Sequence, residues 1–254
     1  MPPLFTGVGV ALVTLFSADG DLQTKATADL AAQLAGLGVR ALLVNGTTGE
    51  AATLAPEERD ELVGAVRAAA PADVPVIAGT GAATGRRAAE LTECAFGSGA
   101  DAVLVLSPPG VADPRRYYDR VARSATGPLL AYHFPGASAP GIAVDLLADL
   151  PVAGLKDSSG DAARLLHERE VFAGDLWTGA ASLLSLSGGI GAAGGLVAAA
   201  NIAPEECAAA FAGDGAAQVR VAALDRAAAV DFPAGYKRAT AERFGVSAAT
   251  RVGR

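Results

Sequence analysis

Short apolar runs alternate with helix-like segments along most of the chain, and this alternation constrains the fold more than any other feature. The runs Val8–Leu15, Ala41–Val44 and Ala102–Leu106 are almost uninterrupted by polar residues. Such runs indicate strands that are buried on both faces, as in parallel sheets. Between two of them, Thr24–Leu37 carries apolar residues at helical spacing and stops at Gly38.

The same alternation continues to the end of the apolar part of the sequence. Further strands are predicted at Val74–Ala78, Leu129–Tyr132, Val152–Lys156, Phe172–Thr178 and Gly195–Ala199, and further helices from Pro56 and at Arg86–Phe96, Pro114–Ala125, Val144–Leu150, Ala162–Glu168 and Ser182–Leu186. About eight units of this kind close into a (β/α)8 TIM barrel. We therefore predict an α/β fold, with the barrel over residues 1–212 and a short C-terminal helical extension over residues 213–254.

Composition excludes several classes of partner. Hydrophobic residues make up 51% of the 254 residues and charged residues 19%, which is typical of a globular protein with a large core. The net charge of −7 and the lack of a long basic run argue against nucleic acid and anionic membranes as partners. Cys94 and Cys207 lie in helix-like segments and are expected to be reduced thiols, and the N-terminal residues lack the pattern of a signal peptide. We expect a cytoplasmic protein.

One uncharged run, Leu176–Pro204, is long enough to span a bilayer. It is rich in Gly, Ser and Ala and contains several turn signals, so buried barrel strands are the favoured interpretation and no membrane span is expected.

In a barrel of this type the functional groups lie at the C-terminal ends of the strands. This rule selects Thr14, the loop Gly46–Glu50, Gly79–Gly81, Tyr132, Lys156 and Gly179. We expect all of them to face one opening of the barrel.

Lys156 ends an apolar strand in a chain that rarely uses lysine. Only Lys25, Lys156 and Lys237 occur among 20 Lys and Arg residues. Lysine, unlike arginine, can lose its proton in an apolar setting and form an imine. The alternative is a structural lysine that pairs with a carboxylate such as Asp157.

Two other groups near the predicted opening have both a structural and a functional interpretation. Gly46-Thr47-Thr48-Gly49 is either a plain turn or a cradle of backbone N–H groups for an anion such as a carboxylate. Tyr132 is either a core residue or a phenol that relays protons to an adduct on Lys156.

Other familiar motifs have the wrong context. Gly189–Gly194 matches the letters of a dinucleotide-binding loop but precedes a strand and opens no helix. His133 and His167, the two histidines, do not have metal-ligand spacing, and His133 is expected to face away from Tyr132. We predict no cofactor and no metal site.

Four segments together resemble one known family. They are Gly46-Thr47-Thr48-Gly49-Glu50, Gly79-Thr80-Gly81-Ala82, Tyr132-His133-Phe134-Pro135 and the run Gly154–Asp161. In this order they resemble the dihydrodipicolinate synthase / N-acetylneuraminate lyase family, from about Phe5 to Asn201. The resemblance implies a (β/α)8 barrel, usually tetrameric, and aldol chemistry through a lysine imine with pyruvate or a related 2-oxo acid.

The resemblance also implies roles for single residues. Lys156 corresponds to the Schiff-base lysine, Tyr132 to the catalytic tyrosine and Thr47 to the threonine that links to that tyrosine. The residues expected to bind substrate are Thr48, which corresponds to the carboxylate-binding threonine, with Gly46 beside it, and Gly179 and Leu196 at the pyruvate pocket.

Two departures from the family concern the second substrate. The arginine that usually follows the tyrosine segment is replaced by Ala137, and no tyrosine occurs in Ser107–Gly110, where the family donates one across a dimer interface. We therefore expect a Schiff-base lyase or aldolase that makes or cleaves a hydroxy-oxo acid or sugar acid. The alternatives are a dihydrodipicolinate synthase of lysine biosynthesis and a barrel that binds pyruvate without turnover. A homo-oligomer, dimer or tetramer, is expected.

Overall fold

The structure, a computed structural model, describes residues 2–252. Eight parallel strands form a closed barrel in chain order, and β1 completes the ring by pairing with β8. The strands are β1 (Gly7–Ala11), β2 (Leu42–Val44), β3 (Val76–Gly79), β4 (Ala102–Leu106), β5 (Leu129–His133), β6 (Gly154–Asp157), β7 (Asp175–Thr178) and β8 (Gly194–Val197). This ring confirms the predicted (β/α)8 TIM barrel.

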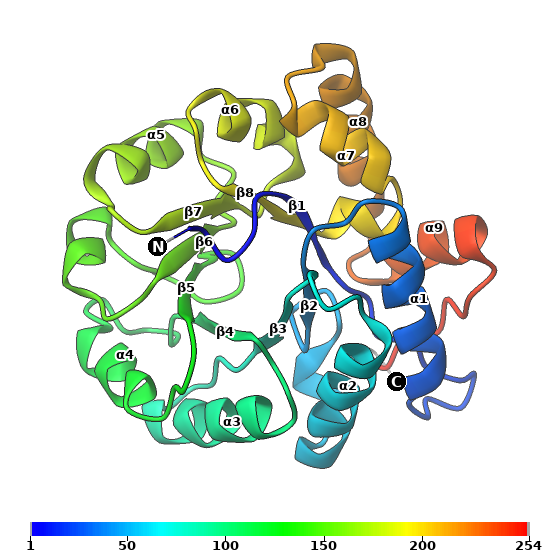
Figure 1. Cartoon of the computed structure of the whole chain (residues 1–254), viewed down its shortest axis with the longest axis horizontal. Helices are drawn as coiled ribbons and strands as arrows, with labels where there is room; N and C mark the ends of the chain where they lie inside the picture. Colours follow the sequence, from blue (N-terminus) through cyan, green and yellow to red (C-terminus); the bar gives the residue numbers. More distant parts are fainter. Residues whose placement is uncertain (1, 253–254) are drawn as a thin grey trace.

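Helices surround the ring of strands (Figure 1). The α-helices are α1 (Thr24–Gly36), α2 (Pro56–Ala69), α3 (Gly85–Gly97), α4 (Arg115–Ala122), α5 (Ala162–Val171), α6 (Leu184–Gly189), α7 (Pro204–Phe211), α8 (Gly215–Ala229) and α9 (Ala234–Phe244). Short 3-10 helices lie at η1 (Ala51–Thr53), η2 (Val144–Asp149), η3 (Ala181–Leu183) and η4 (Ala198–Asn201).

Side chains that alternate along each strand build two separate apolar layers. On β5, Leu129 and Ala131 pack in the layer between strands and helices, whereas Leu130 and Tyr132 belong to the cluster inside the ring. Because of this alternation, every second residue of a strand faces the barrel interior, and only those residues can contribute side chains to the opening of the barrel.

The C-terminal segment is helical, as predicted. Helices α8 and α9 lie outside the ring, on the side of β1 and α1 (Figure 1). The boundary at residue 213 remains a prediction, and residues 1, 253 and 254 of the two predicted segments lie outside the described part of the chain.

The first predicted strand, Val8–Leu15, was too long. Strand β1 ends at Ala11. Beyond it, backbone N–H groups donate to side chains instead of to the carbonyls of a neighbouring strand. The Val13 N–H donates to Asn201 Oδ1 at 3.0 Å, and the Leu15 N–H donates to Thr27 Oγ1 at 3.0 Å.

Three other predicted boundaries were wrong around Pro151 and Gly174. The predicted helix at Val144–Leu150 is the 3-10 helix η2, which ends before Leu150 because a residue that precedes proline favours extended backbone. Strand β6 starts at Gly154, and β7 starts at Asp175, after Gly174.

The uncharged run Leu176–Pro204 is divided among β7, α6, β8 and η4. Within residues 2–252, no helix combines the length and the apolar character that crossing a bilayer requires.

Candidate active site

Lys156 faces the barrel interior from β6. Its neighbour Leu155 packs in the outer apolar layer, and side chains alternate along a strand, so Lys156 faces inward. The sheet register pairs Lys156 with Tyr132 of β5 and with Trp177 of β7. The Lys156 Nζ lies 4.5 Å from the centroid of the Tyr132 ring.

Burial favours the uncharged form of the Lys156 amine. Lys156 is 4% exposed, and within residues 2–252 no carboxylate forms an ion pair with it. The loss of hydration lowers the pKa of Lys156 to about 7. At neutral pH a large fraction of the amine is therefore uncharged, which is the form that attacks a carbonyl carbon.

Asp157, the alternative partner of Lys156, is engaged elsewhere. Its carboxylate accepts hydrogen bonds from the Ser159 N–H at 2.8 Å and the Ser159 hydroxyl at 2.9 Å. It also lies 4.0 Å from Arg164 Nε. The structure therefore does not support a Lys156–Asp157 pair.

Tyr132 supplies an uncharged phenol beside that amine. Burial raises the pKa of Tyr132 to about 12, and hydrogen bonds with the Ser158 and Thr47 side chains oppose part of this rise. The phenol therefore keeps its proton at neutral pH. It can exchange protons with an adduct on Lys156 while Thr47 or Ser158 holds it in place.

The loop after β2 presents unpaired backbone donors. The N–H groups of Gly49 and Glu50 close the turn on the carbonyls of Gly46 and Thr47 at 3.1 Å each. The N–H groups of Thr47 and Thr48 have no protein acceptor among the described residues. Two neighbouring free donors in a tight loop are the arrangement that binds a carboxylate.

Glycine at position 49 allows this loop to pack closely against the segment after β1. A Cβ atom on Gly49 would lie 2.9 Å from Thr14 Oγ1 and 3.0 Å from the Leu12 carbonyl oxygen. Thr14 lies beyond the end of β1 and is buried against the loop, so it contributes to the shape of the loop.

Gly179 leaves room for the lysine side chain. A Cβ atom at this position would lie 1.8 Å from Ser158 Oγ and 2.8 Å from Lys156 Cε. Leu196 is fully buried in the interior cluster that also contains Tyr132 and Trp177. Gly179 therefore lies against the lysine side chain, whereas Leu196 belongs to the apolar cluster inside the ring, and neither residue lines the cavity.

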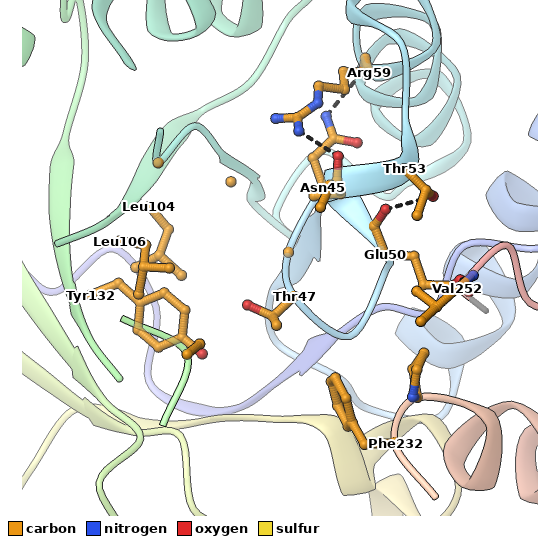
Figure 2. A pocket seen from close by; sticks show the side chains of 17 residues that line it. Asn45, Thr47, Glu50, Thr53, Arg59, Leu104, Leu106, Tyr132, Phe232 and Val252 are labelled. Carbon is orange, nitrogen blue, oxygen red and sulfur yellow. Dashed lines mark hydrogen bonds between the residues drawn. The ribbon is translucent and has the colours of Figure 1, made fainter. Parts of the chain in front are cut away.

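A cavity of about 400 Å³ opens at this end of the barrel (Figure 2). Gly46, Thr47 and Tyr132 line it, as do Gly79 and Gly81 from the loop after β3. Lys156 does not line the cavity; its amine lies against the Tyr132 ring, which does.

Some lining residues were not predicted from the sequence. Arg59 comes from α2, and Phe232, Pro233 and Val252 come from the C-terminal segment. Ser158 was part of the recognised run but had no assigned role. Among the described residues, no cluster of three or more His, Cys, Asp or Glu side chains is arranged around a metal-sized space.

The model of the Dihydrodipicolinate synthetase family matches residues 4–240, which is nearly the whole chain. The chain belongs to this family. Membership confirms the predicted resemblance and the expected class of enzyme, a lyase.

Named relatives within the Dihydrodipicolinate synthetase family include two 4-hydroxy-tetrahydrodipicolinate synthases. The protein of Thioalkalivibrio sulfidiphilus is 35% identical over 233 residues, covering 84% of this chain and 78% of the relative. That of Salinibacter ruber is 40% identical over 168 residues, covering 62% of this chain but only 55% of the relative. The second match thus spans little more than half of that relative's length.

A solved member of the same family has a closely similar backbone. YagE from E. coli K12, described as a prophage protein in complex with pyruvate, superposes with a TM-score of 0.92 at 26% identity. The superposition covers 99% of this chain and 93% of YagE.

One of the two departures from the family pattern falls on the cavity wall. Ala137 lines the cavity wall, at the position where the resemblance predicts an arginine. Gly110 is exposed and has a positive φ of 74°, and its N–H donates to the Ala139 carbonyl at 2.7 Å. This chain therefore brings no cation to the cavity from position 137.

Proposed function

We propose that this chain is a class I lyase in which Lys156 forms an imine with pyruvate or a related 2-oxo acid. The observation that carries the proposal is a buried amine with a pKa of about 7, in contact with the ring of an un-ionised tyrosine. Membership of the family and the pyruvate complex of YagE support the choice of substrate class.

The reaction begins with the free amine. Lys156 Nζ adds to the C2 carbonyl of the 2-oxo acid, and loss of water leaves a protonated imine. The imine withdraws electrons, so C3 gives up a proton and an enamine forms. The enamine carbon attacks an aldehyde and forms a carbon–carbon bond, and water then releases the product from the lysine. Lyase activity is the same sequence reversed.

Neighbouring groups orient the substrate and move protons. The Thr47 and Thr48 N–H groups hold the substrate carboxylate, with Gly46 shaping the turn. Tyr132 transfers protons to and from the oxygens that leave and form. Because Tyr132 lines the cavity and its ring contacts the Lys156 amine, the substrate approaches Lys156 beside this ring.

Two candidate functions within this family differ in the aldehyde that the enzyme uses. The relatives' names favour 4-hydroxy-tetrahydrodipicolinate synthase, the alternative of the sequence analysis, over the main expectation of a hydroxy-oxo acid or sugar acid. In that case the aldehyde is aspartate semialdehyde. Ala137 on the cavity wall is the observation that favours another aldehyde. A homo-oligomer remains part of the proposal.

Imine formation is tested by treating the protein with pyruvate and borohydride and measuring the intact mass and the modified peptide. We expect one adduct, on Lys156. Lys156→Arg should abolish it, whereas Lys25→Arg, which changes an exposed lysine, should not. Absence of the adduct in the wild-type protein would eliminate both enzyme readings.

Turnover is tested with a panel of aldehydes in the presence of pyruvate. Consumption of pyruvate separates a working aldolase from a barrel that only binds pyruvate. Activity with aspartate semialdehyde above that with all other aldehydes would establish the synthase. A protein that forms the adduct but consumes no pyruvate with any aldehyde would support the binding protein instead.

A further inference from the structure

Arg59 is a cation on the cavity wall that forms no ion pair with any described residue, although the charge of Asp60 acts on it. It follows the first turn of α2, and its side chain is half-buried. Within residues 2–252, no carboxylate lies within 4.0 Å of its guanidinium, whereas Arg251 nearby pairs with Glu58 at 2.6 Å. Burial lowers the pKa of Arg59, yet a guanidinium keeps its proton in proteins. Its charge is therefore only partly hydrated and is not balanced by a contacting acid.

The position of Arg59 is fixed by its neighbours. Asn45 Nδ2 donates to the Arg59 carbonyl at 3.0 Å, and one Arg59 amino group donates to the Ala51 carbonyl. The other guanidinium N–H groups have no acceptor among the described residues. Figure 2 shows Arg59 at the top of the pocket and Tyr132 at its lower left, with Thr47 to the right of Tyr132.

The other charged group on the wall is already neutralised. Glu50 forms a fully buried ion pair with Lys237. Its second oxygen accepts the N–H groups of Arg251 and Val252 at 2.8 Å each. The other lining residues are uncharged, so the free charge that a ligand meets in this cavity is that of Arg59.

We infer that the aldehyde taken by this site carries an anionic group away from its carbonyl, and that Arg59 binds that group. This inference rests on the proposed imine chemistry at Lys156. The 2-oxo acid occupies the Thr47 side of the cavity, and the second substrate extends from there toward α2. A guanidinium with several free N–H groups matches the two oxygens of a carboxylate. Arg59 then supplies, from another wall, a charge that Ala137 cannot provide.

The test compares two four-carbon aldehydes that differ at one end. With pyruvate as co-substrate, succinic semialdehyde carries a carboxylate where butyraldehyde carries a methyl group. We expect a lower KM for the anionic aldehyde in the wild-type protein. Arg59→Gln should raise that KM by about 10- to 100-fold and leave the KM for butyraldehyde within about twofold, because it removes a charged hydrogen bond used by one substrate only.

Two further variants separate binding from a structural role. Arg59→Lys keeps the charge but not the paired N–H groups, and should retain part of the preference. Arg86→Gln removes an exposed arginine paired with Glu90 and should change nothing. If Arg59 only supported the Ala51 carbonyl, Arg59→Gln would impair both aldehydes equally, and the inference would be wrong. Glyceraldehyde 3-phosphate, included in the same series, shows whether a phosphate is preferred to a carboxylate.

A direct binding measurement tests the role of Arg59 independently of imine formation at Lys156. Calorimetry with succinate and its neutral diamide, succinamide, requires no reaction at Lys156. We expect the wild-type protein to bind succinate more tightly, and Arg59→Gln to weaken that binding at least tenfold. If borohydride traps no adduct, the imine proposal fails while calorimetry still tests Arg59. Equal binding of succinate by the wild-type protein and Arg59→Gln would overturn the inference even if the adduct forms.

Discussion

Replacing Lys156 by methionine should stabilise the fold while it removes the proposed chemistry. Methionine has nearly the same shape but no charge to bury. The folded protein holds the Lys156 proton only below a pKa of about 7, whereas the unfolded chain holds it up to 10.5. Between these values the unfolded state binds more protons, so the wild-type protein gains stability as pH rises.

The size of this effect follows from the same two pKa values. Each unit of pKa depression corresponds to about 1.4 kcal/mol. Burying Lys156 therefore costs the wild-type fold about 4 kcal/mol at pH 7 and about 2 kcal/mol at pH 9. The advantage of Lys156→Met in the free energy of unfolding should shrink by about 2 kcal/mol between these two pH values.

Urea unfolding at pH 7 and pH 9 measures this difference. Trp177 is the single tryptophan, is fully buried and pairs with Lys156 in the sheet register, so its fluorescence reports on this part of the barrel. Lys25→Met, at an exposed lysine, is the matched control and should show no pH-dependent difference. An advantage of Lys156→Met that stays constant between pH 7 and pH 9 would mean that the amine has an ordinary pKa. The mechanism would then lose its uncharged nucleophile.

Three further predictions concern other residues of the candidate site and its wall. Gly179→Ala places a methyl group 2.8 Å from Lys156 Cε and should slow borohydride-trapped adduct formation about 100-fold, whereas Gly97→Ala, with open space around it, should not. Tyr132→Phe should still form the pyruvate adduct but lower the rate of aldol turnover about 10²- to 10⁴-fold in a pyruvate-consumption assay; unchanged turnover would remove the phenol from the mechanism. Glu50→Gln leaves the buried charge of Lys237 without its partner and should lower the free energy of unfolding by about 3–5 kcal/mol in urea titration. A loss below about 1 kcal/mol would contradict a buried Glu50–Lys237 ion pair.

The barrel and the centre of the site could be predicted because both depend on local patterns. Apolar runs separated by helical periodicity define the strands, and alternation along β5 and β6 places Tyr132 and Lys156 inside the ring. The two strands are adjacent because strands of the barrel follow one another in chain order, whereas the register that pairs Tyr132 with Lys156 is seen only in the structure. Strand ends were harder to predict, since β1 ends where the side chains of Asn201 and Thr27 take over its hydrogen bonds.

The outer wall of the cavity could not be predicted, because it depends on contacts between distant parts of the chain. Phe232 and Val252 reach the opening only after α8 and α9 have folded back along the barrel. The sequence around Arg59 is typical of a charged residue on a surface helix. Arg59 reaches the cavity because α2 packs beside the loop after β2. No periodicity or motif near these residues indicates either arrangement.

The carboxylate of Glu50 joins parts of the chain that are made at very different times. Its hydrogen bonds from Arg251 and Val252 span 201 and 202 residues, and Lys237 enters the same buried contact. During synthesis the eight strands can emerge and pair while this carboxylate still lacks its partners. We therefore expect the substrate-binding loop to become ordered late in folding, after the barrel. A protein cut before α9 would keep its strands but leave the Glu50 carboxylate without these three partners.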